Sequence, residues 1–544
     1  IIVTAEFEDE AAVPFALLYW RLDGEPAFGS QNLIANGNGG LSAEISPLPD
    51  GTIVEYYVRV LDGVNERTWP PASQPGGLQE ANALFQVDDA FDATAPWTPG
   101  SQPIYRIIMT ESERDELEDI GDGNNSPSSE DESNAEMNCT FIVEDGTGFT
   151  LRYLASVRNR GAGSRSPSPN NFLVKFRSDD DWGGRPSVKF NARYGHSQVF
   201  GSWYFRRMGI ETADAAAVQL RINGSDLADP GGPRMYGSYA RVESFGREYS
   251  RNHWPLDSDG NFYQVRDDES TDEEGDLRYE GTDPDNYRDT YFKQTNEFED
   301  NWSDLIALTD ALNNAPAATY VAEIGQVLNI DQWLCEFAVD TLSANREGGL
   351  ITAKGDDYGL YRGINDPRFL LVPHDLDTLF NMGVSSLNAN TSIFSFAGLP
   401  GLTRFFANDE IIQRYYAKLL ELVGGDFSPA VLFPALDELL GDYVSQGKLD
   451  NAREWITDRI PGVLAQIPQE FSATTNLTIS DGFHRTTNGA ATFSGDFQAA
   501  KCLSVRINGR EAVRDQRDGT WEAQIVIADG FFKPGINRVL VQAF

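Results

Sequence analysis

The chain has few of the residues that usually build metal centres or disulfide frameworks. Only three cysteines and four histidines occur among its 544 residues. The cysteines, Cys139, Cys335 and Cys502, are far apart and show no C-x-x-C or Cys/His spacing. This pattern excludes a dense disulfide framework, a zinc motif and a His-rich metal centre. Cys335 lies in a helix-like apolar pattern, so we expect it to be a buried thiol.

Basic residues are also scarce. The chain carries 43 Lys and Arg against 83 Asp and Glu, which gives a formal net charge of −40. Such a surface repels nucleic acid and anionic lipid, so neither is an expected partner. A strongly acidic surface suits a salty or calcium-bearing exterior, because counterions screen its self-repulsion.

Long hydrophobic runs are missing as well. No stretch approaches the roughly 18 consecutive apolar residues that a membrane span requires. The chain begins at Ile1 without Met and has no charged start followed by an apolar run. We therefore expect a processed or trimmed piece of a longer protein, with the targeting signal in the missing part.

The length and the patterning predict three domains, since single cores stop growing beyond roughly 250 to 300 residues. Residues 1–98 contain alternating apolar runs separated by Gly, Asn and Pro turns, which indicates an immunoglobulin- or fibronectin-III-like β-sandwich. Residues 99–468 place strands first and helices later, which favours a two-lobed α+β body. Alternation returns in residues 469–544 and predicts a second β-sandwich.

One segment of the central region concentrates groups that suit a metal-phosphate site. A predicted amphipathic helix ends at Asn345, and a predicted strand, RFLLVP, is followed by Asp375 and Asp377. If this strand continued, both carboxylates would share one face, which suits a hard cation such as Mg²⁺. The alternative is a solvated acidic turn.

A second candidate is the small-residue basic loop that precedes a strand carrying Lys175. The loop contains Ser164 and Arg165 within the sequence RNRGAGSRSPSPNNFLVKF. Small residues let a backbone approach phosphates, and a lysine offers them a point charge. The loop lacks the Walker pattern, so a surface loop with a structural lysine is the alternative.

Three acidic residues further along the chain require an explanation. Glu243 falls in an apolar strand pattern, where an unpaired charge is costly, and Lys175 is our candidate partner. Asp257 and Asp259 form part of a calcium-loop pattern, but the terminal Glu is missing. We favour a plain turn there.

Taken in order, these pieces resemble the CotH kinase family, whose members have an atypical version of the protein-kinase fold. The resemblance covers roughly residues 105–465. It rests on these features: the loop GAGSRS with Lys175 after it, a segment ending RRMGI, the turn Ile222-Asn223-Gly224, a GxYxxxE strand (Gly237, Tyr239, Glu243), a DGNxY turn (Asp259 to Tyr263), an N-x-acid turn at Asn345, a YxLY strand (Tyr358 to Tyr361) and the closing Asp375-Leu376-Asp377.

The resemblance implies transfer of the ATP γ-phosphate to Ser or Thr of secreted or surface proteins, with Mg²⁺ or Mn²⁺ bridging the phosphates. It further implies an extracellular or cell-surface bacterial protein. The roles that it assigns are nucleotide contact for Lys175, Glu243, Ser164 and Arg165, metal binding for Asp375, Asp377 and Asn345, and catalysis for Glu347, Asn345 and Asp375.

The sequence departs from the family pattern at three positions within or directly beside these motifs. Glu347 stands where the family usually has Asp, His374 replaces a Trp, and Gln264 replaces a Lys. A carboxylate displaced by about 1 Å can cost about a hundredfold in rate. Asp340, within the helix, could supply a carboxylate instead, but we favour a solvated helix residue. Arg346 could pair with Glu347 and hold it in a pseudokinase arrangement.

These departures leave a rival hypothesis. The chain could be a catalytically impaired scaffold, a surface or matrix protein that binds Ca²⁺ through acidic loops and self-assembles or joins a surface layer. A third hypothesis is a carbohydrate-active or adhesive protein, because such proteins also have flanking β modules. No residue of the central region supports it.

Overall fold

The computed structural model describes residues 1–7, 15–36, 40–61, 65–72, 79–92, 101–120, 133–146, 148–161, 169–232, 234–266, 274–346, 348–383, 387–487, 489–526 and 530–544. The fold is mixed α+β, as predicted, with strands in the first half and most helices in the second. It divides into a first unit, Ile1–Val199 with Asp214–Ser244, and a second unit, Phe200–Ala213 with Phe245–Phe544. No described helix is long and apolar enough to cross a bilayer.

The first unit begins with two small antiparallel sheets. One has the strand order β1-β5-β4, and the other has the order β3-β2-β6-β7, with β8 also paired to β6. Buried side chains from both sheets, such as Val3, Leu18, Ala43 and Val54, form one hydrophobic cluster. The strands are β1 (Ile2–Ala5), β2 (Phe15–Leu22), β3 (Gly29–Asn32), β4 (Ile34–Ala35), β5 (Leu41–Glu44), β6 (Ile53–Leu61), β7 (Glu66–Trp69) and β8 (Ala83–Gln86).

The rest of the first unit is an eight-stranded sheet in the order β15-β14-β16-β13-β12-β11-β10-β9. A parallel pairing of β14 with β9 joins strands near the two ends, so the sheet closes on itself. Closure pairs backbone edges that would otherwise be open. The strands are β9 (Ile104–Ile108), β10 (Met137–Glu144), β11 (Phe149–Asn159), β12 (Phe172–Lys175), β13 (Ser187–Asn191), β14 (Ala215–Ile222), β15 (Ser225–Asp226) and β16 (Tyr239–Glu243).

The helix α1 (Glu111–Asp119) confirms the capping-box pattern that the sequence shows at its start. The Oγ1 atom of Thr110 accepts a hydrogen bond from the backbone N–H of Glu113 at 3.2 Å, and its hydroxyl donates to the Glu113 carboxylate at 2.9 Å. The first bond satisfies a backbone N–H group that a helix start leaves open, and the second joins the two side chains.

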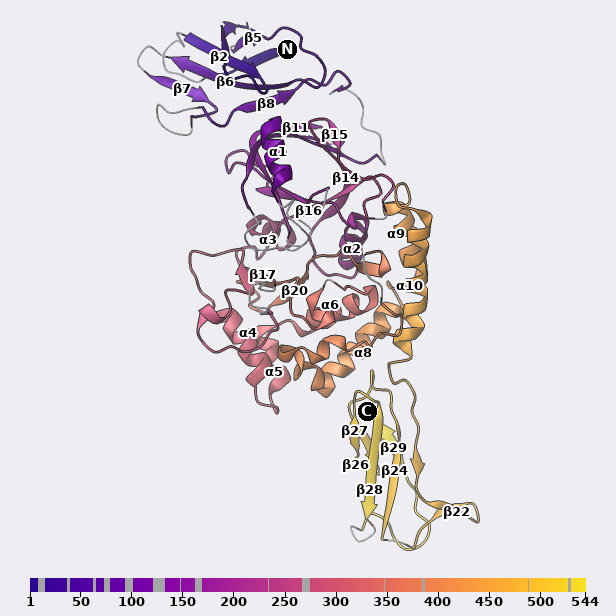
Figure 1. Ribbon diagram of the computed structural model, residues 1–544. Coiled ribbons are helices and arrows are strands. Elements are labelled where there is room, and N and C mark those ends of the chain that lie inside the picture. The colour runs from indigo at the N-terminus through magenta and orange to yellow at the C-terminus, as the bar shows by residue number, and fades with distance from the viewer. Residues whose placement is uncertain are drawn as a thin grey trace. The chain divides into compact units, whose positions relative to one another are not determined.

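The second unit combines helices with a four-stranded antiparallel sheet in the order β18-β17-β19-β20. Helices α6, α8 and α10 contact one another and lie together in Figure 1. These elements are α2 (Gly195–Arg207, which begins in the first unit), α3 (Arg247–His253), β17 (Asn261–Val265), β18 (Tyr291–Lys293), α4 (Ser303–Asn314), α5 (Tyr320–Val327), α6 (Ile330–Ser343), α7 (Gly349–Thr352), β19 (Tyr358–Arg362), β20 (Leu370–Pro373), α8 (Asp409–Val423), α9 (Pro429–Leu440) and α10 (Gln446–Leu464).

The C-terminal part of the second unit is all β. The strand order is β21-β24-β28-β27 in one sheet and β26-β25-β29 in another, and β22 and β23 form a two-stranded hairpin. The long β24 and β28 run antiparallel beside each other in Figure 1. The strands are β21 (Thr474–Thr475), β22 (Thr478–Ser480), β23 (Phe483–Arg485), β24 (Ala490–Asp496), β25 (Val505–Ile507), β26 (Arg510–Glu511), β27 (Val513–Asp515), β28 (Thr520–Val526) and β29 (Val541–Ala543).

The three cysteines are free thiols, as their spacing predicts. Cys139 is buried, whereas Cys335 is only partly buried, so the prediction of a buried thiol at Cys335 is right only in part. Burial raises the pKa of Cys335 to about 11. Its thiol therefore stays protonated at neutral pH, and it lies 3.6 Å from the carbonyl oxygen of Met208.

Candidate functional site

The predicted site residues fall into three groups. Lys175 and Glu243 belong to the first unit, and Asn345, Asp375 and Asp377 belong to the second. Ser164, Arg165 and Glu347 lie outside the described residues.

In the first unit, Lys175 is the last residue of β12 and its side chain is 48% exposed. Its ammonium group forms an ion pair with Glu136. An exposed ion pair of this kind leaves the lysine accessible and contributes at most about 1 kcal/mol to stability.

Glu243 is buried at the end of β16, as its apolar context predicts, but Lys175 is not its partner. Val174 lies opposite Val188, and Val188 lies opposite Glu243, so these three side chains share one face of the sheet. Lys175, next along the strand, points to the other face. The Glu243 carboxylate accepts a hydrogen bond from the Asp214 backbone N–H at 3.3 Å. The predicted Lys175–Glu243 pair is therefore wrong.

In the second unit, α6 carries the predicted Asn turn at its C-terminal end. Ala344 ends the helix in the left-handed region, with φ at +60°. Asn345 follows and is 1% exposed. Its Nδ2 donates to Oδ1 of Asp340 at 3.1 Å, and its Oδ1 accepts from the Gly348 backbone N–H at 3.0 Å. Both ends of the amide are thus fixed inside the protein.

Asp340 is a buried residue, which corrects the prediction of a solvated helix position. Its exposure is 5%, and that of Glu336, one turn earlier on α6, is 2%. Burial raises the pKa of Asp340 to about 7, although the bond from Asn345 opposes this shift. Burial also raises the pKa of Glu336, and the charge of Asp340 adds to the effect. Asp340, which contacts Asn345, and Glu336, one turn earlier on the helix, are thus both in a setting that disfavours their charge.

The Gly348-Gly349 pair is required by close backbone approach at this turn. A Cβ atom at Gly348 would lie 2.5 Å from Nδ2 of Asn345, and one at Gly349 would lie 1.8 Å from Oδ1 of Asp356. Neither position has room for a side chain. The two glycines directly after the Asn-x-acid motif are the sequence signal for this feature.

The acidic loop after β20 differs from the extended geometry that the spacing predicts. The strand ends at Pro373, and Asp375 has φ at +46°, so Asp375 and Asp377 do not continue a strand. Non-glycine residues in the left-handed region of backbone angles carry strain, and such strain concentrates at functional sites. Buried side chains of Leu379 and Phe380 hold the loop in place.

One hydrogen bond joins the Asn345 turn to this acidic loop. The backbone N–H of Arg346 donates to Oγ1 of Thr378 at 2.9 Å, and Thr378 is 1% exposed. The structure therefore brings together two of the segments that the sequence predicts to form the site. Thr378 itself was missed, although it directly follows Asp375-Leu376-Asp377.

Both departures from the family pattern near this loop lie in contact with each other. Nε2 of His374 is 3.3 Å from Nε2 of Gln264 on β17, and its Nδ1 is 3.0 Å from Oδ1 of Asp357. His374 thereby connects the end of β20 to β17 and to the residue before β19. The ring is held by polar contacts on both nitrogens, where the family has an indole.

The acidic segment from Asp257 to Asn261 has a structural role in this unit. Asp257 accepts hydrogen bonds from the backbone N–H groups of Ile364, Asn365 and Asp366 at 2.8 to 3.0 Å. Burial opposes ionisation, but these donors together lower the pKa of Asp257. The carboxylate is used to hold a neighbouring loop, which confirms the turn favoured from sequence.

The donor set of the acidic loop fits a hard divalent cation in chemistry. Mg²⁺ commonly takes one or two carboxylates from the protein and fills its other positions with phosphate and water oxygens. Asp375 and Asp377 are only partly buried, so both can supply oxygens. Within the described ranges, no cluster of three or more His, Cys, Asp or Glu could hold an ion alone.

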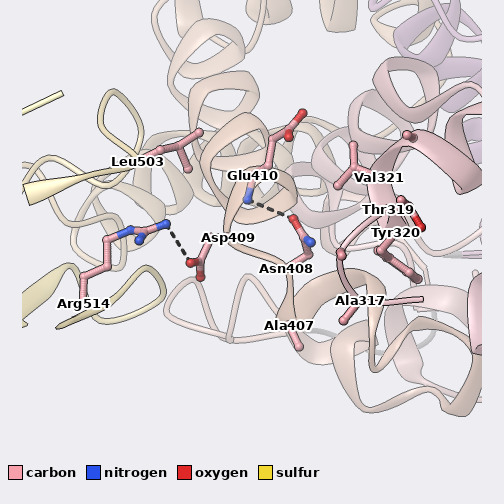
Figure 2. A pocket seen from close by; sticks show the side chains of 12 residues that line it. Ala317, Thr319, Tyr320, Val321, Ala407, Asn408, Asp409, Glu410, Leu503 and Arg514 are labelled. Atoms are coloured by element: carbon pink, nitrogen blue, oxygen red, sulfur yellow. Dashed lines mark hydrogen bonds and ion pairs between the residues drawn. The ribbon is translucent and has the colours of Figure 1, made fainter. Parts of the chain in front are cut away.

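A separate groove of about 680 Å³ occurs elsewhere in the second unit. Figure 2 shows it between the start of α5, the start of α8 and residues of the C-terminal β part, with Arg514 bound to Asp409 at 2.8 Å. None of the predicted site residues lines it. The groove is not the site that the motifs predict.

Fold and site together define a mixed α+β protein. In it, the Asn345 turn at the end of α6 is hydrogen-bonded to the acidic loop at the end of β20. A family model described as CotH kinase protein matches residues 157–446. Because the match covers more than half of the chain, the protein belongs to the CotH kinase family, as the motif order predicts. This membership indicates a kinase-like function. Comparison with curated proteins gave no match.

Proposed function

We propose that the protein is an extracellular phosphotransferase that moves the γ-phosphate of ATP to Ser or Thr of secreted or surface proteins. The observation that carries the proposal is the Arg346–Thr378 hydrogen bond, which places the Asn-x-acid turn beside the Asp375–Asp377 loop. Family membership supports ATP and a divalent metal in general. Phosphoryl transfer depends mainly on positioning and charge neutralisation, and these two segments supply both kinds of group.

In this proposal, Asp375 and Asp377 hold Mg²⁺ or Mn²⁺, which would neutralise phosphate charge when bound. Asn345 orients the turn and Glu347 accepts the proton of the substrate hydroxyl. In the first unit, Lys175 neutralises phosphate charge, and Ser164 and Arg165 approach the phosphates. Glu243 is left out of this site, because its buried carboxylate lies on the opposite face of the sheet from Lys175.

The proposal extends to the architecture and location of the chain. Residues 99–468 would form a two-lobed kinase-like domain between immunoglobulin- or fibronectin-III-like sandwiches at 1–98 and 469–544. The paired sheets of residues 1–86 with one shared core support the first sandwich. The net charge of −40 supports an exterior location, where salt screens self-repulsion.

Two substitutions at Glu347 test the assignment of the catalytic base. Purified protein with Mg²⁺ and γ-labelled ATP should label itself or an acidic, Ser-rich protein. Glu347→Gln should lower the labelling rate by about two to four orders of magnitude, with nucleotide affinity unchanged. Glu347→Asp should retain activity well above that of the Gln variant. Equal rates in the wild type and the Gln variant would exclude Glu347 as the base.

A scaffold that binds Ca²⁺ remains the second candidate, because Glu347 departs from the family Asp and the chain is strongly acidic. Ligands that bind the native state raise the melting temperature by mass action. The kinase proposal expects Mg²⁺ with ATP to raise it more than Mg²⁺ alone. A rise with Ca²⁺ and none with Mg²⁺ and ATP would favour the scaffold.

A further inference from the structure

We propose that Asp340 is a positioning residue whose buried side chain fixes the Asn345 amide and, through it, the turn from Asn345 to Gly348. The inference rests on the proposed function for its kinetic consequence. The structural part of the proposal, that the Asp340 carboxyl fixes the turn through Asn345, can be tested without a measurement of phosphoryl transfer.

The first step is the burial and placement of Asp340 itself. It lies on the last turn of α6. Eleven of the fourteen residues of this helix are buried. The helix ends at Ala344 with a left-handed residue, which turns the chain back so that the side chains of Asp340 and Asn345 meet at 3.1 Å. A buried carboxyl needs hydrogen-bond donors, and the Asn345 amide supplies one.

The second step is the orientation of the Asn345 amide. The Gly348 backbone N–H can only donate, so it requires the Oδ1 atom of Asn345 to face it. This orientation leaves Nδ2 as the group that faces Asp340, where Oδ1 of the carboxyl accepts. Asp340 and Gly348 therefore select the same rotamer, and loss of the Asp340 acceptor would leave a buried N–H group unpaired.

The third step links the turn to the acidic loop. The residues on either side of Glu347 each have a fixed backbone N–H: that of Arg346 is bound to Thr378, and that of Gly348 is bound to Asn345. Because Asp340 orients Asn345, it governs the second of these anchors. Its side chain therefore sets the placement of Gly348 at the end of the turn.

A swap of the two side chains tests this arrangement directly. Asn345→Asp alone would place two carboxyls against each other and remove the donor. The double variant Asp340→Asn with Asn345→Asp restores a donor and an acceptor with the roles reversed, while the new carboxylate still accepts from Gly348. Asp340→Ala removes the acceptor, and Asp340→Asn alone keeps one. Asp331→Ala, on the exposed start of α6, is the matched control.

The primary readout is hydrogen exchange of the Gly348 amide in the full chain. Exchange should rise at least about tenfold in Asp340→Ala and Asn345→Asp. In the swap the exchange rate should return to within about threefold of the wild-type rate. In Asp340→Asn and in the control it should also lie within about threefold of the wild-type rate. Equal exchange in Asn345→Asp and the swap, or unchanged exchange in Asp340→Ala, would overturn the proposal.

The second readout separates the inference from the proposed function. If the wild type transfers phosphate, kcat should fall about a hundredfold in Asp340→Ala and recover at least about tenfold in the swap. The KM for ATP should change by no more than about twofold. If the wild type transfers none but the exchange pattern holds, the proposed function fails and the positioning role stands. If the wild type is active and kcat is the same in the wild type, in Asp340→Ala and in the swap, the positioning role in catalysis is contradicted.

Discussion

The backbone N–H of Arg346 donates a 2.9 Å hydrogen bond to the hydroxyl of Thr378, and this bond joins the two acidic segments of the second unit. Arg346 lies in the turn after α6, whereas Thr378 lies in the loop after β20. Thr378 is almost completely buried, so water cannot easily replace the bond.

Replacement of Thr378 by valine should therefore destabilise the protein and loosen the site. Valine keeps the shape but removes the acceptor, which leaves a partly buried N–H group unpaired at a cost of about 1 to 3 kcal/mol. Chemical denaturation measures this cost. Thr378→Ser, which keeps the hydroxyl, is the control and should lose less stability than the valine variant. Equal losses in both would show that the methyl group matters and the bond does not.

Glu336 should give stability an unusual dependence on pH. Burial raises its folded-state pKa, so the folded protein holds this proton more tightly than the unfolded chain does. The resulting stabilisation is complete below the unfolded pKa of about 4.3 and is lost as pH rises towards the folded pKa. Within that window the free energy of unfolding should fall by up to about 1.4 kcal/mol per pH unit from this group.

Glu336→Gln removes that proton equilibrium without changing the size of the side chain. Urea denaturation from pH 5 to 8 should show a shallower fall in the variant, which gains stability relative to the wild type as pH rises. Glu421→Gln, an exposed position on α8, should keep the wild-type slope. Parallel curves for Glu336→Gln and the wild type would refute the assignment.

Gly349 should tolerate no side chain. A Cβ atom there would lie 1.8 Å from Oδ1 and 2.3 Å from the backbone nitrogen of Asp356. Gly349→Ala must push the backbone apart and should cost about 1 to 3 kcal/mol. Gly447→Ala in α10 meets nothing within 4 Å and should be neutral or stabilising by up to about 1 kcal/mol. Thermal melts compare the two, and a Gly349→Ala variant as stable as Gly447→Ala would contradict the packing.

The sequence predicted the elements with strong periodicity and missed those without it. The alternating strands and the amphipathic helix α6 are present because a regular apolar face needs burial. The helix α10 was not predicted: charged residues are spread along it and Pro461 lies inside it. It nevertheless packs on α6, where Arg459 donates to the Thr341 carbonyl at 3.2 Å.

The candidate site was predicted in its parts but not in its connections. The motif order located Asn345 and Asp375 because their spacing is local. The pairing of Lys175 with Glu243 failed because the face of a strand depends on register with distant strands. Burial of Asp340 and the left-handed conformation of Asp375 arise from tertiary packing, which local pattern does not encode.

The most direct test of the proposed kinase activity is the transfer of label from γ-labelled ATP by the wild type and by Asp375→Asn, with Mg²⁺ and an acidic, Ser-rich acceptor protein. Asparagine keeps the side-chain size but removes the charge that would hold the metal, and Asp366→Asn on the exposed loop before β20 is the control. We expect phosphorylated Ser or Thr with the wild type and the control, and at least about a hundredfold less with Asp375→Asn. Equal labelling by all three proteins, or none above background with the wild type, would contradict it.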